Sequence, residues 1–255
     1  LEVKHMSFRY DGADRDTLHD ISLTIKPGEK VAFVGENGAG KTTFVKLLMH
    51  LYDVTDGSIC YGGHDIREYG TGAYRERIGA VFQDYQIYGT TLAENVLMDE
   101  VKEGDRERIL EALKQADFEK KLSRLPDGPD TNMTREFRED GTMLSGGEAQ
   151  KVAIARMFVR TGKQFLAILD EPSSALDPLA EYQLNTNMMK NAGDAAVIFI
   201  SHRLSTTRDA DRIYMFENGR IIEQGSHQEL MRLGGKYAAM FEKQAYYYQD
   251  EIAAC

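Results

Sequence analysis

The sequence predicts an α/β fold, and three apolar runs support that class. FLAILD (165–170) and AAVIFI (195–200) are continuous apolar segments, which are typical of parallel strands covered on both faces. KVAFV (30–34) is a third such run, and it stands directly before a glycine-rich loop and the helix-like segment TTFVKLLMHLY. The chain has 255 residues, of which 42% are apolar, so it is large enough to bury the core that such a sheet requires.

Local patterns on either side of these runs predict further elements. Residues 1–10 and 18–25 alternate apolar and polar side chains, which indicates strands of an antiparallel β subdomain beside the core. Near the end of the chain, Asn218 and Gly219 lie between two alternating apolar runs and predict a β-hairpin. We expect two short helices after this hairpin.

The middle of the chain has a different character. Between about 85 and 161 the pattern is helical and charged, as in DRERILEALKQADFEKKL, and LPDGPD (125–130) interrupts it. We therefore expect one domain with two subdomains. An α/β core, about 1–84 and 162–255, carries a mainly helical insertion, about 85–161.

Charge and cysteine content argue against several classes of function. The formal net charge is −10, which argues against a general nucleic-acid binder because phosphate backbones require clustered lysine and arginine. The two cysteines, Cys60 and Cys255, have no disulfide framework or metal-ligand spacing, which favours a reducing cytosolic setting. No apolar run approaches the roughly 18–20 residues that span a bilayer, so we expect no membrane-spanning segment in this sequence.

The strongest functional motif is GENGAGKTT (35–43), which fits the pattern G-x-x-x-x-G-K-[ST] with Gly35, Gly40, Lys41 and Thr42. Its glycines allow successive backbone N–H groups to turn toward phosphate oxygens, and the following helix adds the positive end of its dipole. Lys41 supplies a charge for the β- and γ-phosphates, and the Thr42 hydroxyl is a ligand for Mg²⁺. A simple glycine-rich turn, the alternative, does not explain the lysine and threonine in register.

A partner for this loop lies in FLAILDEP (165–172). Asp170 and Glu171 end a buried strand, so one carboxylate is placed to hold Mg²⁺, directly or through water, and the other to polarise an attacking water. Solvated acids at a strand end are the alternative, and the second acid favours hydrolysis over binding alone. The order of these elements is that of a P-loop NTPase with a RecA-like core: a strand, a glycine loop, a helix, and later a buried strand that ends in acidic residues.

Five motifs, GENGAGKTT, LSGGE, LAILDEP, SALD and SHRLS, follow one another in this sequence. With this series the chain resembles the nucleotide-binding domain of ABC transporters over essentially its whole length. The segment REFREDGTMLSGGE is similar to the exporter branch, with Glu139 at the place of that segment's glutamate and Arg138 where many exporters have glycine. The resemblance implies an ATPase whose ligands are ATP and Mg²⁺. The implied ATP-binding residues are Tyr10, Gly35, Asn37, Gly38, Ala39, Gly40, Lys41, Thr42 and Thr43.

Two implied site residues flank the first part of the core. Tyr10, in SFRYDG, is at the place of the aromatic residue that stacks on adenine, and a core or surface position is the alternative. Gln83 matches the glutamine that contacts Mg²⁺ or the attacking water at the hinge of the insertion, whereas a lone glutamine is ordinarily a surface residue. The stretch 84–97 after it would face the transmembrane partner. Its apolar residues suit that interface or packing within the insertion: Tyr85, Ile87, Tyr88, Leu92 and Val96.

Two later residues complete the implied site. His202, in VIFISHRLS, follows a buried strand as the family's switch histidine does, so its imidazole is placed to bond the γ-phosphate and orient the water beside Glu171. Asp177, in SALDP, matches the D-loop at the dimer interface, and an Asp-Pro turn before a helix is a compatible alternative. The implied catalytic residues are Glu171, His202 and Gln83, and the implied Mg²⁺ ligands are Thr42, Gln83 and Asp170.

A second glycine-rich helix start, LSGGEAQKVAIAR (144–156), has no lysine between its glycines and the helix. Taken alone, Ser145 and Glu148 form a capping box, in which the side chain of each residue accepts a hydrogen bond from the backbone N–H of the other. The resemblance adds a ligand, because the N–H groups of Gly146 and Gly147 would bind the γ-phosphate of the opposite subunit. Glu148 stands where the commonest signature has glutamine, so we expect it to serve as the cap partner. The signature comprises Leu144, Ser145, Gly146, Gly147 and Glu148.

The resemblance also implies partners. Two such domains, identical or homologous, would enclose two ATP–Mg²⁺ at the cytoplasmic face of a cell membrane. They would drive a transmembrane domain that is fused N-terminal to this sequence or encoded separately, and no nucleic-acid partner is expected. One alternative is a soluble ABC-type ATPase acting on ribosomes or nucleic acid, but such proteins carry two cassettes or very long coiled-coil insertions. A binding module with vestigial chemistry is the other, and the intact Lys41, Asp170, Glu171 and His202 argue against it.

Overall fold

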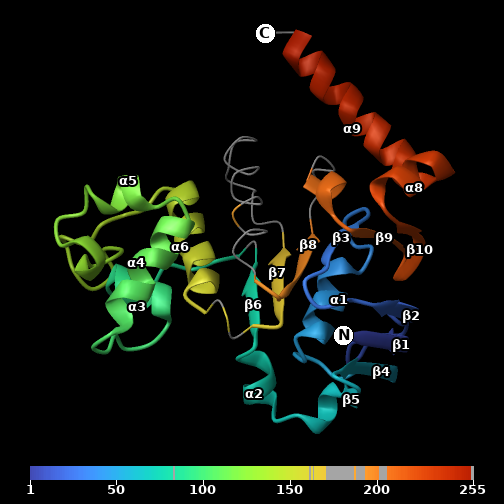
Figure 1. Cartoon of the computed structure of the whole chain (residues 1–255), viewed down its shortest axis with the longest axis horizontal. Coiled ribbons are helices and arrows are strands. Elements are labelled where there is room, and N and C mark those ends of the chain that lie inside the picture. The colour runs from blue at the N-terminus through green and yellow to red at the C-terminus, as the bar shows by residue number, and fades with distance from the viewer. Residues whose placement is uncertain are drawn as a thin grey trace. The chain divides into compact units, whose positions relative to one another are not determined.

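The computed structural model describes two compact units of the chain (Figure 1). The described residues are 1–82, 84–160, 162, 164–170, 187, 193–200 and 206–253, the last eight by their backbone alone. The first unit comprises Leu1–Ile78, Phe165–Asp170 and Asp194–Cys255, and the second comprises Gly79–Gln164 and Glu171–Gly193.

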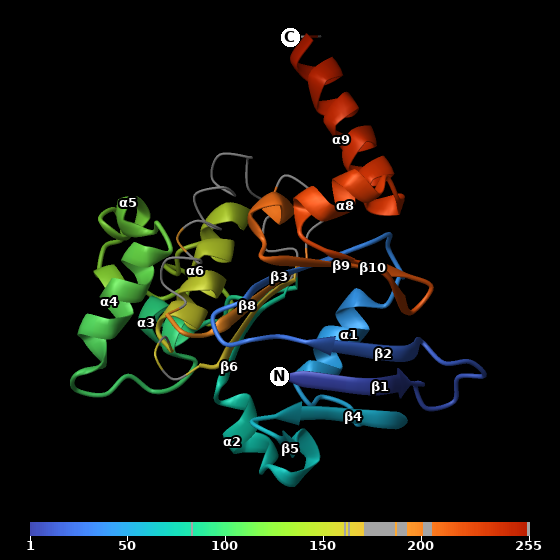
Figure 2. The same cartoon turned by 45° about the vertical axis from the view of Figure 1, so that its right-hand side comes forward.

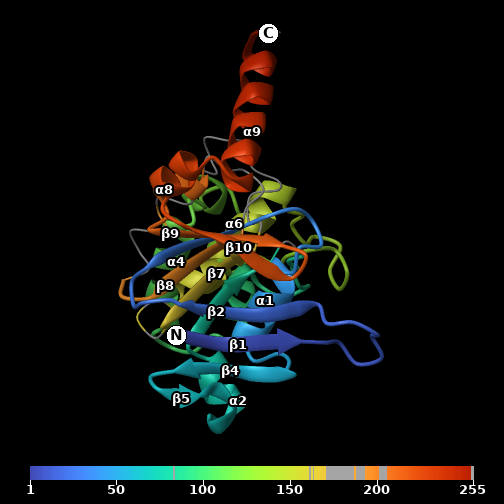
Figure 3. The same cartoon turned by 90° about the vertical axis from the view of Figure 1, so that its right-hand side faces the viewer.

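The first unit contains a four-stranded antiparallel sheet of order β2-β1-β4-β5 (Figure 3). Its strands are β1 (Glu2–Phe8), β2 (Leu18–Thr24), β4 (Asp56–Tyr61) and β5 (His64–Asp65). The alternation along β2 arises because Leu18, Ile21 and Leu23 are buried on one face while their neighbours face outward. The two predicted strands and their antiparallel pairing are confirmed.

A larger sheet has the strand order β10-β9-β3-β8-β7-β6. Its strands are β3 (Lys30–Val34), β6 (Ile78–Val81), β7 (Leu166–Asp170), β8 (Ala196–Ile200), β9 (Arg212–Glu217) and β10 (Arg220–Gly225). β3 pairs in parallel with β8 and β9, and β7 pairs in parallel with β8. Every residue of β7 and β8 is buried, which is the physical reason for their continuous apolar sequences. The predicted α/β class is therefore confirmed.

The predicted hairpin is also confirmed. β9 and β10 are antiparallel, and Asn218 and Gly219 join them with φ of 47° and 72°. A positive φ at both central positions is the conformation that asparagine and glycine tolerate best, and it matches the twist of the two strands.

Helices complete the first unit. They are α1 (Lys41–Leu48), α2 (Thr71–Arg75), α8 (His227–Leu233) and α9 (Lys236–Ala253), with 3₁₀ turns η1 (Ile66–Glu68) and η3 (Thr206–Asp209). Leu230 of α8 and Tyr237 of α9 pack against Val34 and Met215 of the larger sheet, and Figure 2 shows both helices beside β9 and β10. The expectation of two short terminal helices is wrong for α9, which has 18 residues because no glycine or proline interrupts it.

The second unit is mainly helical. The helices in its described part are α3 (Leu92–Leu97), α4 (Asp105–Gln115), α5 (Glu119–Leu122) and α6 (Gly146–Phe158), with a 3₁₀ turn η2 (Gly128–Asp130). α6 packs against α3 and α4, and its Val152 and Ile154 are fully buried. Leu92 and Val96 are buried in the same way, so packing within the unit accounts for these two residues of the 84–97 stretch. Among the described residues, no helix has the length and apolar character that crossing a bilayer requires.

Candidate functional site

The predicted phosphate loop joins β3 to α1, and two of its glycines are required by the backbone. Gly35 has a φ of 142°, and a Cβ there would lie 2.2 Å from the carbonyl oxygen of Phe216. Gly40 precedes α1 with a φ of 104°, and a Cβ there would lie 2.5 Å from Cδ2 of Leu18. Both positions therefore exclude any side chain, which fixes the start and the end of the loop.

Three aromatic rings hold the elements that flank the loop. Phe33 of β3 lies with its ring centroid 5.3 Å from those of both Phe44 of α1 and Phe216 of β9. The centroids of Phe44 and Phe216 are 5.6 Å apart. All three side chains are fully buried, so the strand before the loop and the helix after it share one rigid support.

The Lys41 ammonium lies inside the loop. Its side chain is buried, with 5% of the residue exposed, and Nζ donates to the carbonyl oxygens of Gly35 at 2.8 Å and Glu36 at 3.0 Å. The backbone therefore curls around a fixed positive charge at the N-terminus of a helix. This combination of a lysine charge and the positive end of a helix dipole is the chemistry that binds a polyphosphate.

Asp170 lies at the same edge of the sheet as this loop. It ends β7 and pairs with Ile200 of β8, and Ile200 in turn pairs with Phe33 of β3, two residues before the loop. The carboxyl ends of parallel strands form the usual ligand-binding edge of an α/β sheet. Asp170 is 6% exposed, so its carboxylate is held at this edge away from bulk water.

Tyr10 stands beside the first turn of α1. Its hydroxyl is 3.2 Å from the Thr43 hydroxyl, and its ring contacts Phe8 and Tyr52 edge-to-face at centroid distances of 4.8 Å and 5.4 Å. The structure thus brings Tyr10 together with the phosphate loop. Tyr52 was not among the predicted site residues, because nothing in its local sequence marks an aromatic residue as a neighbour of the loop.

A cavity of about 540 Å³ borders the outer part of the phosphate loop. It is lined by Glu36–Ala39 of the loop, by the hairpin residues Met215–Asn218 and by Lys236, Ala239, Met240 and Lys243 of α9. The predicted ATP-binding residues Asn37, Gly38 and Ala39 therefore line this cavity. Ala39 is also tied to its neighbours, because its N–H donates to the Glu36 carbonyl oxygen and its carbonyl oxygen accepts from the Gly219 N–H of the hairpin.

The second glycine-rich helix start forms the predicted capping box at the N-terminus of α6. The Ser145 N–H donates to Oε2 of Glu148 at 2.9 Å, and the Glu148 N–H donates to Oγ of Ser145 at 3.3 Å. Lys121 of α5 adds an ion pair, with its Nζ 3.1 Å from Oε1 of Glu148. Partial burial raises the pKa of Glu148, but the Ser145 N–H and the Lys121 ammonium outweigh it and hold the pKa below its usual value. The side chain is therefore a carboxylate engaged in capping.

Glu148→Gln should therefore leave ATP hydrolysis within a few-fold of the wild-type rate and lower the free energy of unfolding by about 0.5–1 kcal/mol or less. The matched control is Glu229→Gln, because Ser226 and Glu229 form the same capping box on α8 in the other unit. Phosphate-release rates and chemical denaturation of both variants check this. A much larger loss of activity in Glu148→Gln than in the control would place Glu148 in the site itself.

A partly buried polar network surrounds the other end of α6. Arg156 donates from Nε to the carbonyl oxygen of Asn95 at 2.8 Å and from Nη2 to that of Gln86 at 2.6 Å, and its guanidinium lies 5.7 Å from the ring centroid of Tyr88. The buried Asn95 side chain accepts from the Tyr88 N–H and donates to the Tyr88 carbonyl oxygen. This network holds the stretch after Gln83 in one shape. No sequence signal marked it.

Four predicted site residues, Gln83, Glu171, Asp177 and His202, lie outside the described residues. The helix-like segment 179–190 also lies outside them, apart from Asn187.

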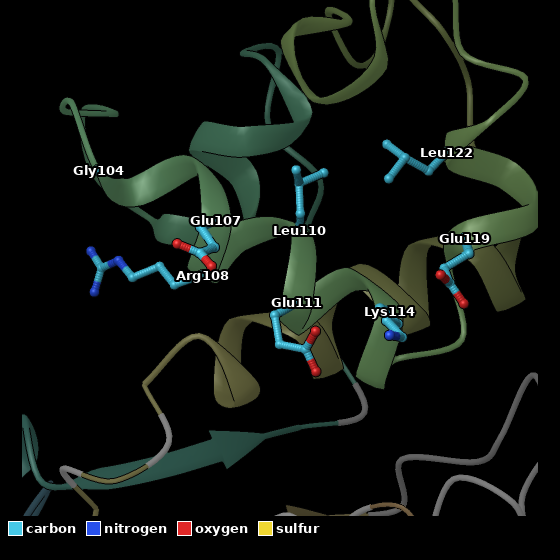
Figure 4. Close-up of a pocket in the computed structure, with 8 residues that line it drawn as sticks. All are labelled: Gly104, Glu107, Arg108, Leu110, Glu111, Lys114, Glu119 and Leu122. Atoms are coloured by element: carbon cyan, nitrogen blue, oxygen red, sulfur yellow. The ribbon is translucent and has the colours of Figure 1, made fainter.

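A separate cavity of about 590 Å³ lies between α4 and α5 in the helical unit (Figure 4). It is lined by Gly104, Glu107, Arg108, Leu110, Glu111, Lys114, Glu119 and Leu122. Charges of both signs surround two leucines, and none of the predicted site residues is among the lining residues. The cavity therefore has no part in the candidate nucleotide site.

Comparisons with known proteins agree with this geometry. The family model for ABC transporters matches residues 18–174, which is more than half of the chain. The chain belongs to the ABC transporter family. ATP-binding domains of this family bind nucleotide and are ATPases coupled to transport, so the predicted family and enzyme class are confirmed.

Relatives of this ABC transporter domain are exporters by name. A multidrug export ATP-binding/permease protein of Staphylococcus aureus is 39% identical over 244 residues, which is 96% of this chain and 41% of the relative. YgaD of Bacillus subtilis, named in the same way, is 39% identical over 94% of this chain and 40% of its own length. A solved bacterial Atm1-family ABC exporter with ATP bound matches with a TM-score of 0.85 and 38% identity, over 96% of this chain and 41% of that one. The chain thus spans about two fifths of the length of these proteins.

Proposed function

We propose that this chain is the nucleotide-binding domain of a membrane exporter, and that its ATP hydrolysis powers export through attached or associated transmembrane domains. One observation carries the proposal. A loop that encloses the Lys41 ammonium stands at the carboxyl ends of the parallel strands of the larger sheet, the same edge as the buried carboxylate of Asp170. The names of the relatives, which join an ATP-binding part to a permease, support the export function.

The nucleotide would bind along the first unit. Adenine stacks on Tyr10, and the phosphates occupy the loop from Gly35 to Thr43, whose amides and Lys41 neutralise the phosphate charge. Thr42 and Asp170, together with Gln83, would hold Mg²⁺, which withdraws charge from the phosphate oxygens when bound. These residues suit the ion, because Mg²⁺ prefers a hydroxyl and one or two carboxylates beside phosphate oxygens, and Asp170 is a buried carboxylate at the right edge.

Hydrolysis is assigned to groups that follow β7 and β8. The Glu171 carboxylate accepts a proton from a water whose oxygen forms a bond to the γ-phosphorus. The bond from that phosphorus to the β–γ bridging oxygen breaks and leaves ADP and phosphate. His202 bonds the γ-phosphate and orients the water, and Gln83 contacts the same water.

The site needs a second, identical or homologous domain. Ser145 and Gly146 at the start of α6 are exposed, and the capping box uses the N–H groups of Ser145 and Glu148, so the N–H groups of Gly146 and Gly147 are the ones that would bind a γ-phosphate held by another copy. Asp177 of the D-loop lies across the same interface in this proposal. Two ATP molecules are thus enclosed between the loop of one domain and the signature of the other.

The helical unit would contact the transmembrane partner. Several large apolar side chains are exposed in the described part of this unit, and the most exposed are Phe137 at 82%, Met143 at 61% and Tyr88 at 49%. Apolar surface of this kind supports an interface with another protein segment. In this proposal the core, about 1–84 and 162–255, hydrolyses ATP at the cytoplasmic face of the membrane, and the insertion, about 85–161, transmits its movement.

Glu171→Gln tests the assignment. The amide cannot accept the proton of the attacking water, so this variant should bind ATP normally, release almost no phosphate and accumulate as an ATP-bound dimer. Equilibrium binding of ATP, phosphate release and size-exclusion chromatography with ATP measure the three effects, with the exposed Glu103→Gln as control. Normal hydrolysis by Glu171→Gln would refute the catalytic assignment.

The alternative of a soluble ATPase acting on ribosomes or nucleic acid is not favoured. The relatives reported above are named as ATP-binding/permease proteins, and the match includes the solved exporter. The net charge of −10 also opposes binding to a phosphate backbone.

A further inference from the structure

The Tyr85 side chain reaches the start of the signature helix. Its hydroxyl donates to the carbonyl oxygen of Gly146, the first residue of α6, at 2.9 Å. Tyr85 belongs to the stretch 84–97, and both residues lie in the helical unit. Tyr85, in the stretch proposed to face the transmembrane domain, is thus bonded to Gly146, which is proposed to bind the ATP held by a second nucleotide-binding domain.

The bond from Tyr85 to Gly146 is one of two polar side-chain contacts that other segments make with the first turn of α6 in the part of the chain that the structure describes. On the side of α5, Lys121 holds the first turn through Glu148. Gln150 lies one turn after Gly146 on the same helix face, but its amide is buried and makes no hydrogen bond within the described part of the chain. Among the described residues of the stretch 84–91, the Tyr85 hydroxyl is the only group that forms a hydrogen bond with this turn.

The same stretch is fastened to the last turn of α6. Arg156 donates to the carbonyl oxygen of Gln86, the residue directly after Tyr85. Neighbouring residues therefore bond opposite ends of one helix, so a displacement of the stretch is passed to the whole of α6. Burial raises the pKa of the Tyr85 hydroxyl, which keeps its proton available for donation.

We infer that Tyr85 is a positioning residue for the signature: its hydroxyl sets the orientation of the helix turn that presents the N–H groups of Gly146 and Gly147. The inference rests on the proposed function, in which those groups bind a γ-phosphate held by a second domain. Hydrogen-bond donors stabilise a phosphate more strongly when their direction is fixed beforehand, because no free energy is then spent on orienting them. Tyr85 acts by fixing that direction and does not touch the nucleotide.

The test compares Tyr85→Phe with Tyr69→Phe in the 255-residue chain. Tyr69 is a matched control, because its hydroxyl also donates to a backbone carbonyl oxygen, that of Tyr61 at 2.8 Å, and it lies in the other unit. Three quantities are measured for each protein: the affinity for a fluorescent ATP analogue, the unfolding midpoint, and the ATPase rate per chain as chain concentration is raised.

Tyr85→Phe should raise the chain concentration at half-maximal ATPase rate by about three- to tenfold, which is the effect of one net hydrogen bond. Tyr69→Phe should leave this concentration unchanged, and both variants should keep the wild-type affinity for the analogue. If the ATPase rates of the two variants depended on chain concentration in the same way, the role of Tyr85 would be overturned, and the two-domain site would stand. A wild-type rate per chain that does not rise with concentration would overturn the two-domain site and the inference together.

Discussion

Lys41→Met is expected to lower the rate of ATP hydrolysis by about 100- to 1,000-fold, the usual effect of removing one preorganised group that stabilises transition-state charge. The structure gives the reason. The ammonium is buried in the loop and held by the carbonyl oxygens of Gly35 and Glu36, so a positive charge is already fixed where a phosphate would bind. Phosphate release under saturating ATP measures the loss.

Lys46→Met is the matched control, because Lys46 lies on the same helix α1 but further from the loop. It should hydrolyse ATP at close to the wild-type rate. Circular dichroism of both variants shows whether the chain still folds when the Lys41 ammonium no longer bonds the loop's carbonyl groups. A folded Lys41→Met protein with normal activity would contradict the placement of the γ-phosphate in this loop.

Arg156→Ala is expected to lower the free energy of unfolding by about 1.5–3 kcal/mol, mainly through the partly buried bond to Asn95, because water can replace the donor at the exposed Gln86. Hydrogen bonds to a charged group contribute about 1.5–3 kcal/mol each, and removing the guanidinium leaves the carbonyl oxygens of Gln86 and Asn95 without this donor. Asn95 is itself buried and bonds the Tyr88 backbone, so its position depends on Arg156. Urea denaturation followed by circular dichroism measures the change.

Arg160→Ala provides the comparison. Arg160 follows Arg156 by four positions and is exposed, so its removal should change the free energy of unfolding by less than about 0.5 kcal/mol. Similar losses in the two variants would show that the Arg156 bonds are not what stabilises the helical unit.

Features with a local cause were predictable from the sequence. The capping box needs only Ser145 and Glu148, three positions apart, and the hairpin needs only Asn218 and Gly219 between alternating runs. The apolar runs that became β7 and β8 are continuous because both faces of these strands are covered. In each case the residues that determine the structure are neighbours in the chain.

Contacts between distant segments were not predictable in this way. The bond from Tyr85 to Gly146 and the pair of Lys121 with Glu148 depend on how α6 packs, and no single segment encodes its partner. The structure shows where Lys41, Asp170 and Tyr10 lie, but their roles in binding and catalysis stay predictions. The same holds for Gln83, Glu171, Asp177 and His202, which lie outside the described residues.

The order of the strands has a consequence for synthesis of the chain. The antiparallel sheet uses only residues up to Asp65, so it can form while the ribosome is still translating. β3 must wait, because Val31 pairs with Ile198 of β8 and with Arg212 of β9, and such long loop closures are slow. The phosphate loop leaves the ribosome early but acquires its fixed shape only after most of the chain has followed it.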